Sequence, residues 1–213
     1  MSKLGVMGGT FDPIHYGHLV TAEEARAQFG LDQVLFVPNR HPPHKDPRDV
    51  TDPEDRYLMT FLATVSNPAF SASRIEIDRP GASYTIDTIR ALAAHYPDAD
   101  IYYITGADAI LQILRGEWAQ SEALLGMCRF IAATRPGYSL DLETLRRSNN
   151  TGRTLDNVLV MEIPALAISS TDIRTRVREG RPIAYLVPEA VEAYIRKRQL
   201  YVRPAVPRSP AGG

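Results

Sequence analysis

Short, continuous apolar runs alternate with segments of helical periodicity along this chain. The first apolar run, residues 4–7, ends at Gly8-Gly9, which is typical of a buried strand that enters a turn. Residues 16–29 then carry apolar side chains at helical spacing, and Gly30 suits a helix C-terminus. The same pattern predicts further strands over 34–37, 70–77, 101–104, 129–133 and 158–163, and further helices over 52–65, 85–95, 107–114, 118–125, 139–147, 170–179 and 188–198.

Apolar strands separated by helices indicate a parallel sheet that is covered by helices on both faces. We therefore expect an α/β fold of the Rossmann-like, doubly wound type. Residues 1–203 are expected to form a single domain, and residues 204–213, rich in Pro, Arg, Ser and Gly, a disordered tail. Ligands of such folds bind beyond the carboxyl ends of strands. The segments in that position are 8–18, 38–45, 105–108, 134–137 and 164–174.

One predicted helix has an unusually clear start. Asp52 can cap it, Pro53 suits the first turn, and acidic residues follow near its positive end. Apolar side chains then recur at i, i+3, i+4 and i+7 and form one face of the helix. Its members are Leu58, Phe61, Leu62 and Val65. The Pro- and His-containing residues 39–50 before this helix are expected to form a long exposed loop, and loops of that length inside a domain are usually functional.

Composition narrows the class of protein. Of 213 residues, 44% are hydrophobic and 23% charged, which excludes a disordered, collagen-like or low-complexity chain. The 24 Lys and Arg nearly balance the 25 Asp and Glu, so a nucleic-acid partner is not expected. The single cysteine, Cys128, cannot form an internal disulfide. No apolar run is long enough for a membrane span or a signal peptide, and we expect a cytoplasmic protein.

The first candidate site is the segment 8–18. Its two glycines allow a phosphate to approach the backbone, and the helix that follows points its positive end at the same place. His15 and His18 are three residues apart, hence on one face of the first helical turn, and Gly17 leaves room beside them. The segment matches neither GxxxxGK[ST] nor GxGxxG. A tight turn with two surface histidines is the alternative, but the combination with Gly-Gly favours a phosphate site.

Two further segments fit the same chemistry. Residues 168–174 place hydroxyl groups at a helix start and Arg174 one turn later, which suits an anion. Lys45, in the Pro-Pro-His-Lys run of the 39–50 loop, could reach a polyphosphate. A serine-capped helix and a solubilising loop charge are the plainer interpretations. Histidines alone do not indicate zinc here, because no Cys or acid recurs at ligand spacing, and we expect no protein-bound metal.

Together, these segments resemble the HxGH nucleotidyltransferase superfamily and, within it, bacterial nicotinate-nucleotide adenylyltransferases. The motifs GGTFDPIHYGH, PPHK, SYTIDTI, GAD, a following tryptophan, RPG, ISSTDIR and PEAVEAYIR occur in the family's order, over about residues 3–202. The resemblance implies transfer of the adenylyl group of ATP to nicotinate mononucleotide, giving deamido-NAD and pyrophosphate by direct attack without a covalent intermediate. It implies Mg²⁺ bound with ATP, and it leaves the oligomeric state open, a homo-oligomer included.

The resemblance also assigns residues. Those implied in catalysis are His15, His18, Lys45 and Arg174. Those implied in ATP binding are Gly8, Gly9, Thr10, Phe11, Gly106, Asp108, Arg135, Ile168, Ser169, Ser170 and Thr171. Those implied in binding the mononucleotide are Tyr84, Thr85 and Trp118. Taken singly, Asp108 could be a helix cap, Arg135 a surface cation and Trp118 a packing residue.

Two alternative functions remain at this stage. Pantetheine-phosphate adenylyltransferases share the fold and the ISST motif, but that family usually has threonine in place of His15, is shorter and lacks the Trp118 region. A catalytically inactive nucleotide-binding regulator would be expected to carry damage in HxGH or ISSTDIR, and neither motif is damaged. A pyrophosphate-release assay separates the active from the inactive alternative.

Overall fold

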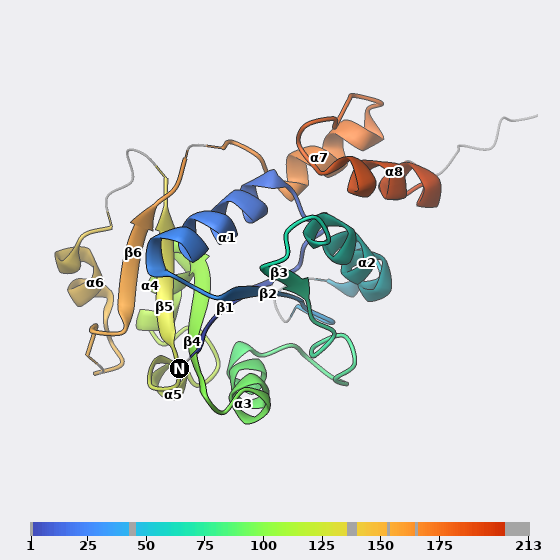
Figure 1. The fold of residues 1–213 in the computed structure, drawn as a ribbon. Helices are drawn as coiled ribbons and strands as arrows, with labels where there is room; N and C mark the ends of the chain where they lie inside the picture. Colours follow the sequence, from blue (N-terminus) through green and yellow to red (C-terminus); the bar gives the residue numbers. More distant parts are fainter. Residues whose placement is uncertain (1, 43–45, 136–139, 153, 165, 203–213) are drawn as a thin grey trace, which may run out of the picture.

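The computed structural model describes residues 2–42, 46–135, 140–152, 154–164 and 166–202 (Figure 1). Helices and strands alternate as predicted. The strands are β1 (Ser2–Gly9), β2 (Gln33–Pro38), β3 (Phe70–Ala72), β4 (Ala99–Gly106), β5 (Arg129–Thr134) and β6 (Val158–Glu162). The helices are α1 (Tyr16–Phe29), α2 (Pro53–Thr64), α3 (Thr85–His95), α4 (Ala107–Leu114), α5 (Ser121–Leu125), α6 (Leu142–Ser148), α7 (Ser170–Arg178) and α8 (Glu189–Arg198), with a 3₁₀ turn η1 (Pro47–Asp49).

The described strands form one parallel sheet in the order β3-β2-β1-β4-β5-β6. This is the doubly wound order, and it confirms the predicted Rossmann-like fold. Strands β1 to β3 extend the sheet in one direction, and β4 to β6 extend it in the other. The switch between β1 and β4 leaves a crevice at their carboxyl ends, where the connections leave toward opposite sides.

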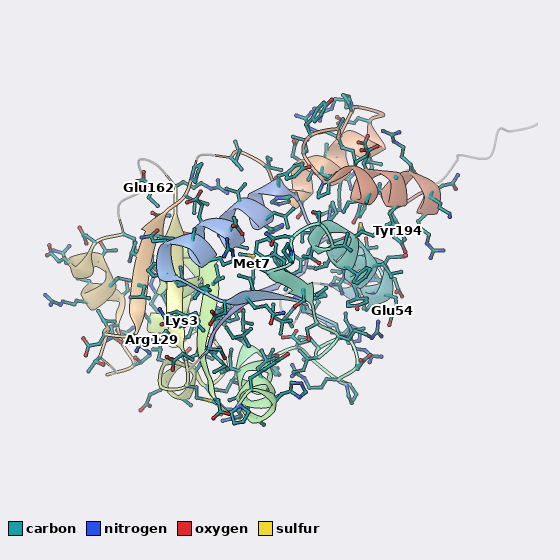
Figure 2. The ribbon with its side chains drawn as sticks, in the orientation of Figure 1. Lys3, Met7, Glu54, Arg129, Glu162 and Tyr194 are labelled. Carbon is teal, nitrogen blue, oxygen red and sulfur yellow. The ribbon has the colours of Figure 1, made fainter. Side chains whose placement is uncertain are left out.

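Each face of the sheet has its own hydrophobic core, because successive strand residues point to opposite sides. Leu4 and Val6 of β1 contribute to the core that also contains α3, α4, α5 and α6 side chains. Met7 contributes to the other core, with side chains of α1, α2, α7 and α8. The prediction of helices on both faces is thus confirmed. Figure 2 shows Tyr194 of α8 and Glu54 of α2 on adjacent helices, and the Tyr194 hydroxyl donates to Asp55 of α2 at 2.6 Å.

Three sequence-based boundaries were wrong by three residues or more. One is the start of the helix predicted over 139–147: α6 begins at Leu142, because Asp141 caps it. The strand predicted over 70–77 stops at Ala72, because the Asp78 N–H bonds the Arg74 carbonyl 2.8 Å away and turns the chain. The Arg74 guanidinium holds that turn through Glu54 and Asp78, at 2.7 and 2.8 Å. The helix predicted over 118–125 begins only at Ser121, since Gln120 has a left-handed φ of 53°.

The apolar face predicted on α2 does not pack as one face. Leu58, Phe61 and Val65 are exposed. The helix instead buries Met59 and Ala63 with the polar Arg56. Tertiary contacts of the arginine side chain, described below, therefore set the rotation of this helix.

Among the described residues, none of the helices has the length and apolar character needed to cross a bilayer. The tail predicted over 204–213 lies outside the described residues.

Candidate active site

The turn between β1 and α1 holds the two histidines in contact. His15 is the N-cap residue of α1, and its backbone N–H donates to Nδ1 of His18 at 3.3 Å. The two rings stack with centroids 3.8 Å apart. A Cβ on Gly17 would lie 3.0 Å from the His15 ring, so glycine is needed for this ring position. Because Nδ1 of His18 accepts a hydrogen bond, its proton resides on Nε2, which is left as a donor.

Both imidazoles are neutral at neutral pH. Burial, and then the charge of Arg135, lower the pKa of His15 from 6.5 to about 4. Burial, and then His15, lower the pKa of His18 well below 6.5. Nδ1 of His15 is buried and has no hydrogen-bond partner among the described residues. The pair therefore offers neutral hydrogen-bonding groups to a ligand rather than two positive charges.

The start of α7 is fastened to the same turn. Ser169 caps α7 by accepting from the Asp172 N–H at 3.1 Å. Ser170 Oγ donates to the Pro13 carbonyl, and Arg174 donates to the Asp12 carbonyl, each at 2.8 Å. Segments about 160 positions apart in sequence thus bring the N-termini of α1 and α7 to one place. Two positive helix ends at one place favour binding of an anion such as phosphate.

A cavity of about 410 Å³, here called the histidine pocket, opens beside these helix starts. It lies where β1, β4 and β5 end, at the switch point of the sheet. The structure brings together here predicted site residues from four separate segments. They are Gly8, His15, His18, Gly106, Arg135, Ile168, Ser169 and Ser170.

A second cavity of about 520 Å³, the tryptophan pocket, shares Gly8 with the first. Its described lining includes the predicted residues assigned to the mononucleotide, Tyr84, Thr85 and Trp118. Gly9 and Thr10, which the resemblance assigned to ATP, also lie in this pocket and not in the histidine pocket. Tyr84 precedes the first turn of α3, so free backbone N–H groups and a partial positive charge lie at this wall. The Trp118 indole Nε1 donates to Gln112 at 3.1 Å, which fixes the ring.

Four predicted residues are described but line neither pocket. Phe11 is buried beneath the turn, and its ring meets the edge of His18 at 5.1 Å. Asp108 and Thr171 are exposed. Arg174 reaches the turn through Asp12, and its second nitrogen lies 3.4 Å from Thr171 Oγ1. Lys45 lies outside the described residues, so its assignment stays a prediction.

The sequence analysis missed polar residues beneath and around the pockets. Arg56 of α2 is fully buried, and burial lowers the pKa of its guanidinium. Asn39 and Glu76 line the tryptophan pocket, and burial raises the pKa of the Glu76 carboxyl. Arg79 bonds Thr88 Oγ1 at 3.0 Å beside the first turn of α3. No local signal marked Arg56, which precedes the apolar repeat that begins at Leu58.

Comparisons with known proteins identify the family. A family model described as Cytidylyltransferase-like matches residues 6–176. A protein of Moorella thermoacetica named "Probable nicotinate-nucleotide adenylyltransferase" is 56% identical over 200 residues, covering 93% of this chain and 91% of that protein. A protein of the same name from Streptomyces coelicolor is 55% identical, covering 92% and 98%. The chain belongs to the nicotinate-nucleotide adenylyltransferase family.

Solved structures of other proteins have the same fold as this chain. The nicotinic acid mononucleotide adenylyltransferase of Plasmodium falciparum, complexed with NaAD, aligns with a TM-score of 0.75 at 21% identity, covering 94% of this chain and 98% of that one. Its complex with APC aligns with a TM-score of 0.74. Nicotinate-nucleotide adenylyltransferases therefore share this doubly wound fold even where their sequences have diverged widely.

Proposed function

We propose that this chain transfers the adenylyl group of ATP to nicotinate mononucleotide, giving deamido-NAD and pyrophosphate in NAD biosynthesis. One observation carries the proposal: two pockets, sized for two nucleotides, share Gly8 of the turn that holds the histidine pair. A reaction that joins two nucleotides through a pyrophosphate bridge needs this arrangement. Membership of the nicotinate-nucleotide adenylyltransferase family supports it independently.

The chemistry requires no covalent intermediate. An oxygen of the mononucleotide 5′-phosphate attacks the α-phosphorus of ATP. The bond from that phosphorus to the oxygen bridging to the β-phosphorus breaks, and pyrophosphate leaves with the electron pair. A monoester phosphate with a second pKa of about 6 is mostly dianionic near neutral pH, so no strong base is needed. Catalysis then consists of alignment and of stabilising charge on the transferred group.

The histidine pocket takes the ATP side in this proposal. His18 donates from Nε2 to the transferring phosphate, beside the paired His15. Ser169, Ser170 and the two converging helix starts receive the remaining phosphate oxygens, and Gly106 and Arg135 flank the adenosine. Arg174 keeps the start of α7 in place through Asp12. Lys45, in the loop predicted over 39–50, adds positive charge in this proposal.

The tryptophan pocket takes nicotinate mononucleotide. Trp118 offers a flat face to the pyridine ring. The start of α3 at Tyr84 and Thr85 supplies N–H donors to the ring carboxylate, whereas an amide in the same position would turn its own N–H₂ toward donors. Polar groups left unpaired in this way discriminate strongly between substrates. The pocket should therefore prefer the acid over the amide.

Magnesium enters this scheme as part of the Mg–ATP substrate. The described lining of the histidine pocket contains no carboxylate, and no group of three His, Cys, Asp or Glu side chains in the described part of the chain is arranged for a metal. This donor set suits phosphate oxygens, so the ligands of Mg²⁺ come from the ATP phosphates and water. An ion bound with ATP would supply positive charge against the leaving pyrophosphate.

Pyrophosphate release measured with three acceptors tests the function. Nicotinate mononucleotide, nicotinamide mononucleotide and 4′-phosphopantetheine are compared at saturating Mg–ATP. We expect kcat/KM for the acid to exceed that for the amide by at least about tenfold, equivalent to about 1.4 kcal/mol, and no release with phosphopantetheine. Parity of acid and amide contradicts the acid specificity. Release with phosphopantetheine alone indicates the other adenylyltransferase, and no release with any acceptor indicates an inactive regulator.

A further inference from the structure

The buried guanidinium of Arg56 joins three separate segments beneath the active site. Its Nε donates to the Thr51 carbonyl at 2.8 Å, and one terminal nitrogen donates to the Thr10 carbonyl at 2.8 Å and to Asn39 Oδ1 at 3.3 Å. The other terminal nitrogen donates to the Arg40 carbonyl at 3.0 Å. A buried cation is costly unless its donors are satisfied, and here backbone carbonyls provide most of the acceptors.

These acceptors occupy defined places in the chain. Arg40 and Thr51 stand at the two ends of the segment 40–51, and Thr10 belongs to the turn that carries the histidines. Further bonds reinforce the same junction: the Asn39 N–H donates to the Gly9 carbonyl at 3.0 Å, and the Thr51 N–H donates to Asp12 Oδ2 at 3.2 Å. One planar side chain therefore sets both ends of this segment against the turn.

The same junction forms part of the tryptophan pocket. Gly9, Thr10 and Asn39 all line that pocket, whereas none of the four Arg56 acceptors lines the histidine pocket. A displacement of about 1 Å in a wall that aligns a reacting group can cost about 10² in rate. The effect of losing Arg56 should therefore fall on the mononucleotide more than on ATP.

We infer that Arg56 is a positioning residue for adenylyl transfer, which fixes the mononucleotide wall of the site by tying Thr10, Asn39 and both ends of the segment 40–51 together. The inference rests on the proposed function. Lysine keeps the charge but cannot supply donors in the planar fork that reaches four acceptors in different directions. Arg56→Lys thus separates the geometry of this side chain from its charge.

Steady-state kinetics of Arg56→Lys give the main test. We expect kcat/KM for nicotinate mononucleotide to fall at least tenfold while the KM for ATP changes by less than about threefold. Ala63→Gly is the matched control: Ala63 is buried on the same helix, two turns further along, and its replacement weakens the helix without touching the turn. Equal changes for both substrates, or the same pattern in Ala63→Gly, would overturn the inference.

Amide hydrogen exchange in the wild-type chain gives a second test that does not depend on the variant folding. The N–H groups of Asn39 and Thr51 should exchange as slowly as that of Val6 in the core of β1, because the junction opens only with the domain. Exchange about 100-fold faster than at Val6 would show that the junction is not fixed, and would overturn the inference.

Wild-type turnover is measured first. Its absence contradicts the proposed function, whereas normal turnover with unchanged kinetic constants in Arg56→Lys contradicts only the positioning role.

Discussion

The two imidazoles of the turn are held as a buried, stacked pair rather than as two independent surface groups. Their low pKa values follow mainly from burial, to which the charge of Arg135 adds at His15 and the neighbouring His15 adds at His18, so each is neutral when the substrates arrive. A neutral Nε2–H still donates to phosphate, and it does not need to lose a proton to accommodate Mg–ATP. Their contribution should therefore be to the transition state, through a preorganised donor.

Alanine substitution tests that contribution. We expect His18→Ala to lower kcat by about 10² or more, the usual cost of one transition-state donor. His15→Ala should lie within about tenfold of it, because the variant loses the ring that stacks on His18, although it keeps the backbone N–H that donates to His18 Nδ1. His95→Ala, an exposed histidine at the end of α3, is the control and should leave kcat unchanged. Wild-type turnover in a folded His18→Ala chain would contradict the assignment.

Burial of the pair should also make folding pH-dependent. The pKa of His15 is about 4 in the folded chain and 6.5 in its unperturbed state, so the unfolded chain binds the proton first as pH falls. Stability is thus complete above about pH 6.5 and declines toward pH 4, by about 3 kcal/mol for His15. Urea unfolding at pH 7.5 and pH 5 measures this. His15→Asn should flatten the dependence, and an unchanged slope would show that other groups cause it.

The start of α3 is the element that we expect to choose between acid and amide. The sequence offered only backbone donors and the helix dipole, since no lysine or arginine lies within residues 83–87. The fold adds Arg79, whose guanidinium bonds Thr88 in the first turns of that helix and lies 4.0 Å from the buried Glu76 carboxylate. This cation offsets the negative charge of Glu76 at the wall of the tryptophan pocket.

Arg79→Gln should therefore reduce the preference for the acid mononucleotide. Without the guanidinium, Glu76 repels the ring carboxylate, so kcat/KM for the acid should fall by about three- to tenfold while that for the neutral amide changes little. Arg90→Gln serves as the control, because it removes an exposed cation of α3 that is paired with Asp87. An equal fall for acid and amide would mean that Arg79 only supports the helix.

At the scale of the whole molecule, the segment that follows α8 contacts the turn that follows β1. The Tyr201 hydroxyl donates to Asp12 Oδ1 at 2.7 Å, beneath the turn that carries the histidines. Burial and Asp12 raise the pKa of Tyr201, which keeps the phenol protonated as a donor. Helix α8 reaches α2 in the same region through Tyr194 and Asp55. The C-terminal helices thus support the active-site turn from outside the pockets.

Tyr201→Phe should lower the free energy of unfolding by about 1–3 kcal/mol, because it leaves a buried carboxylate oxygen without its donor. It should also lower kcat/KM by several-fold through the turn. A chain that ends at Val202 keeps this contact and should match the full-length chain in both measurements. Thermal unfolding and pyrophosphate release compare the three proteins, and a Tyr201→Phe chain indistinguishable from wild type would contradict the link.

Local patterns in the sequence were sufficient for the alternation of strands and helices, and hence for the parallel sheet, because apolar runs and helical periodicity reflect burial directly. They were also sufficient to single out the turn after β1 as a candidate site, because Gly-Gly, the paired histidines and the helix start are all within eleven residues. The strand after Phe70 and the outward face of α2 were misjudged for one reason: contacts with residues distant in sequence determine them. Arg74 closes a turn with Glu54, and Arg56 rotates its helix to reach Thr10 and Arg40.

The pairing of ISSTDIR with the histidine turn, and the support from Arg56 and Tyr201, depend on packing between segments up to 189 positions apart. No periodicity encodes such contacts, since a buried polar side chain resembles a solvated one until its acceptors are in place. The histidines illustrate the same limit. Their spacing indicated one shared face, but only burial in the fold, with Arg135 beside His15, lowers their pKa values and makes both rings neutral.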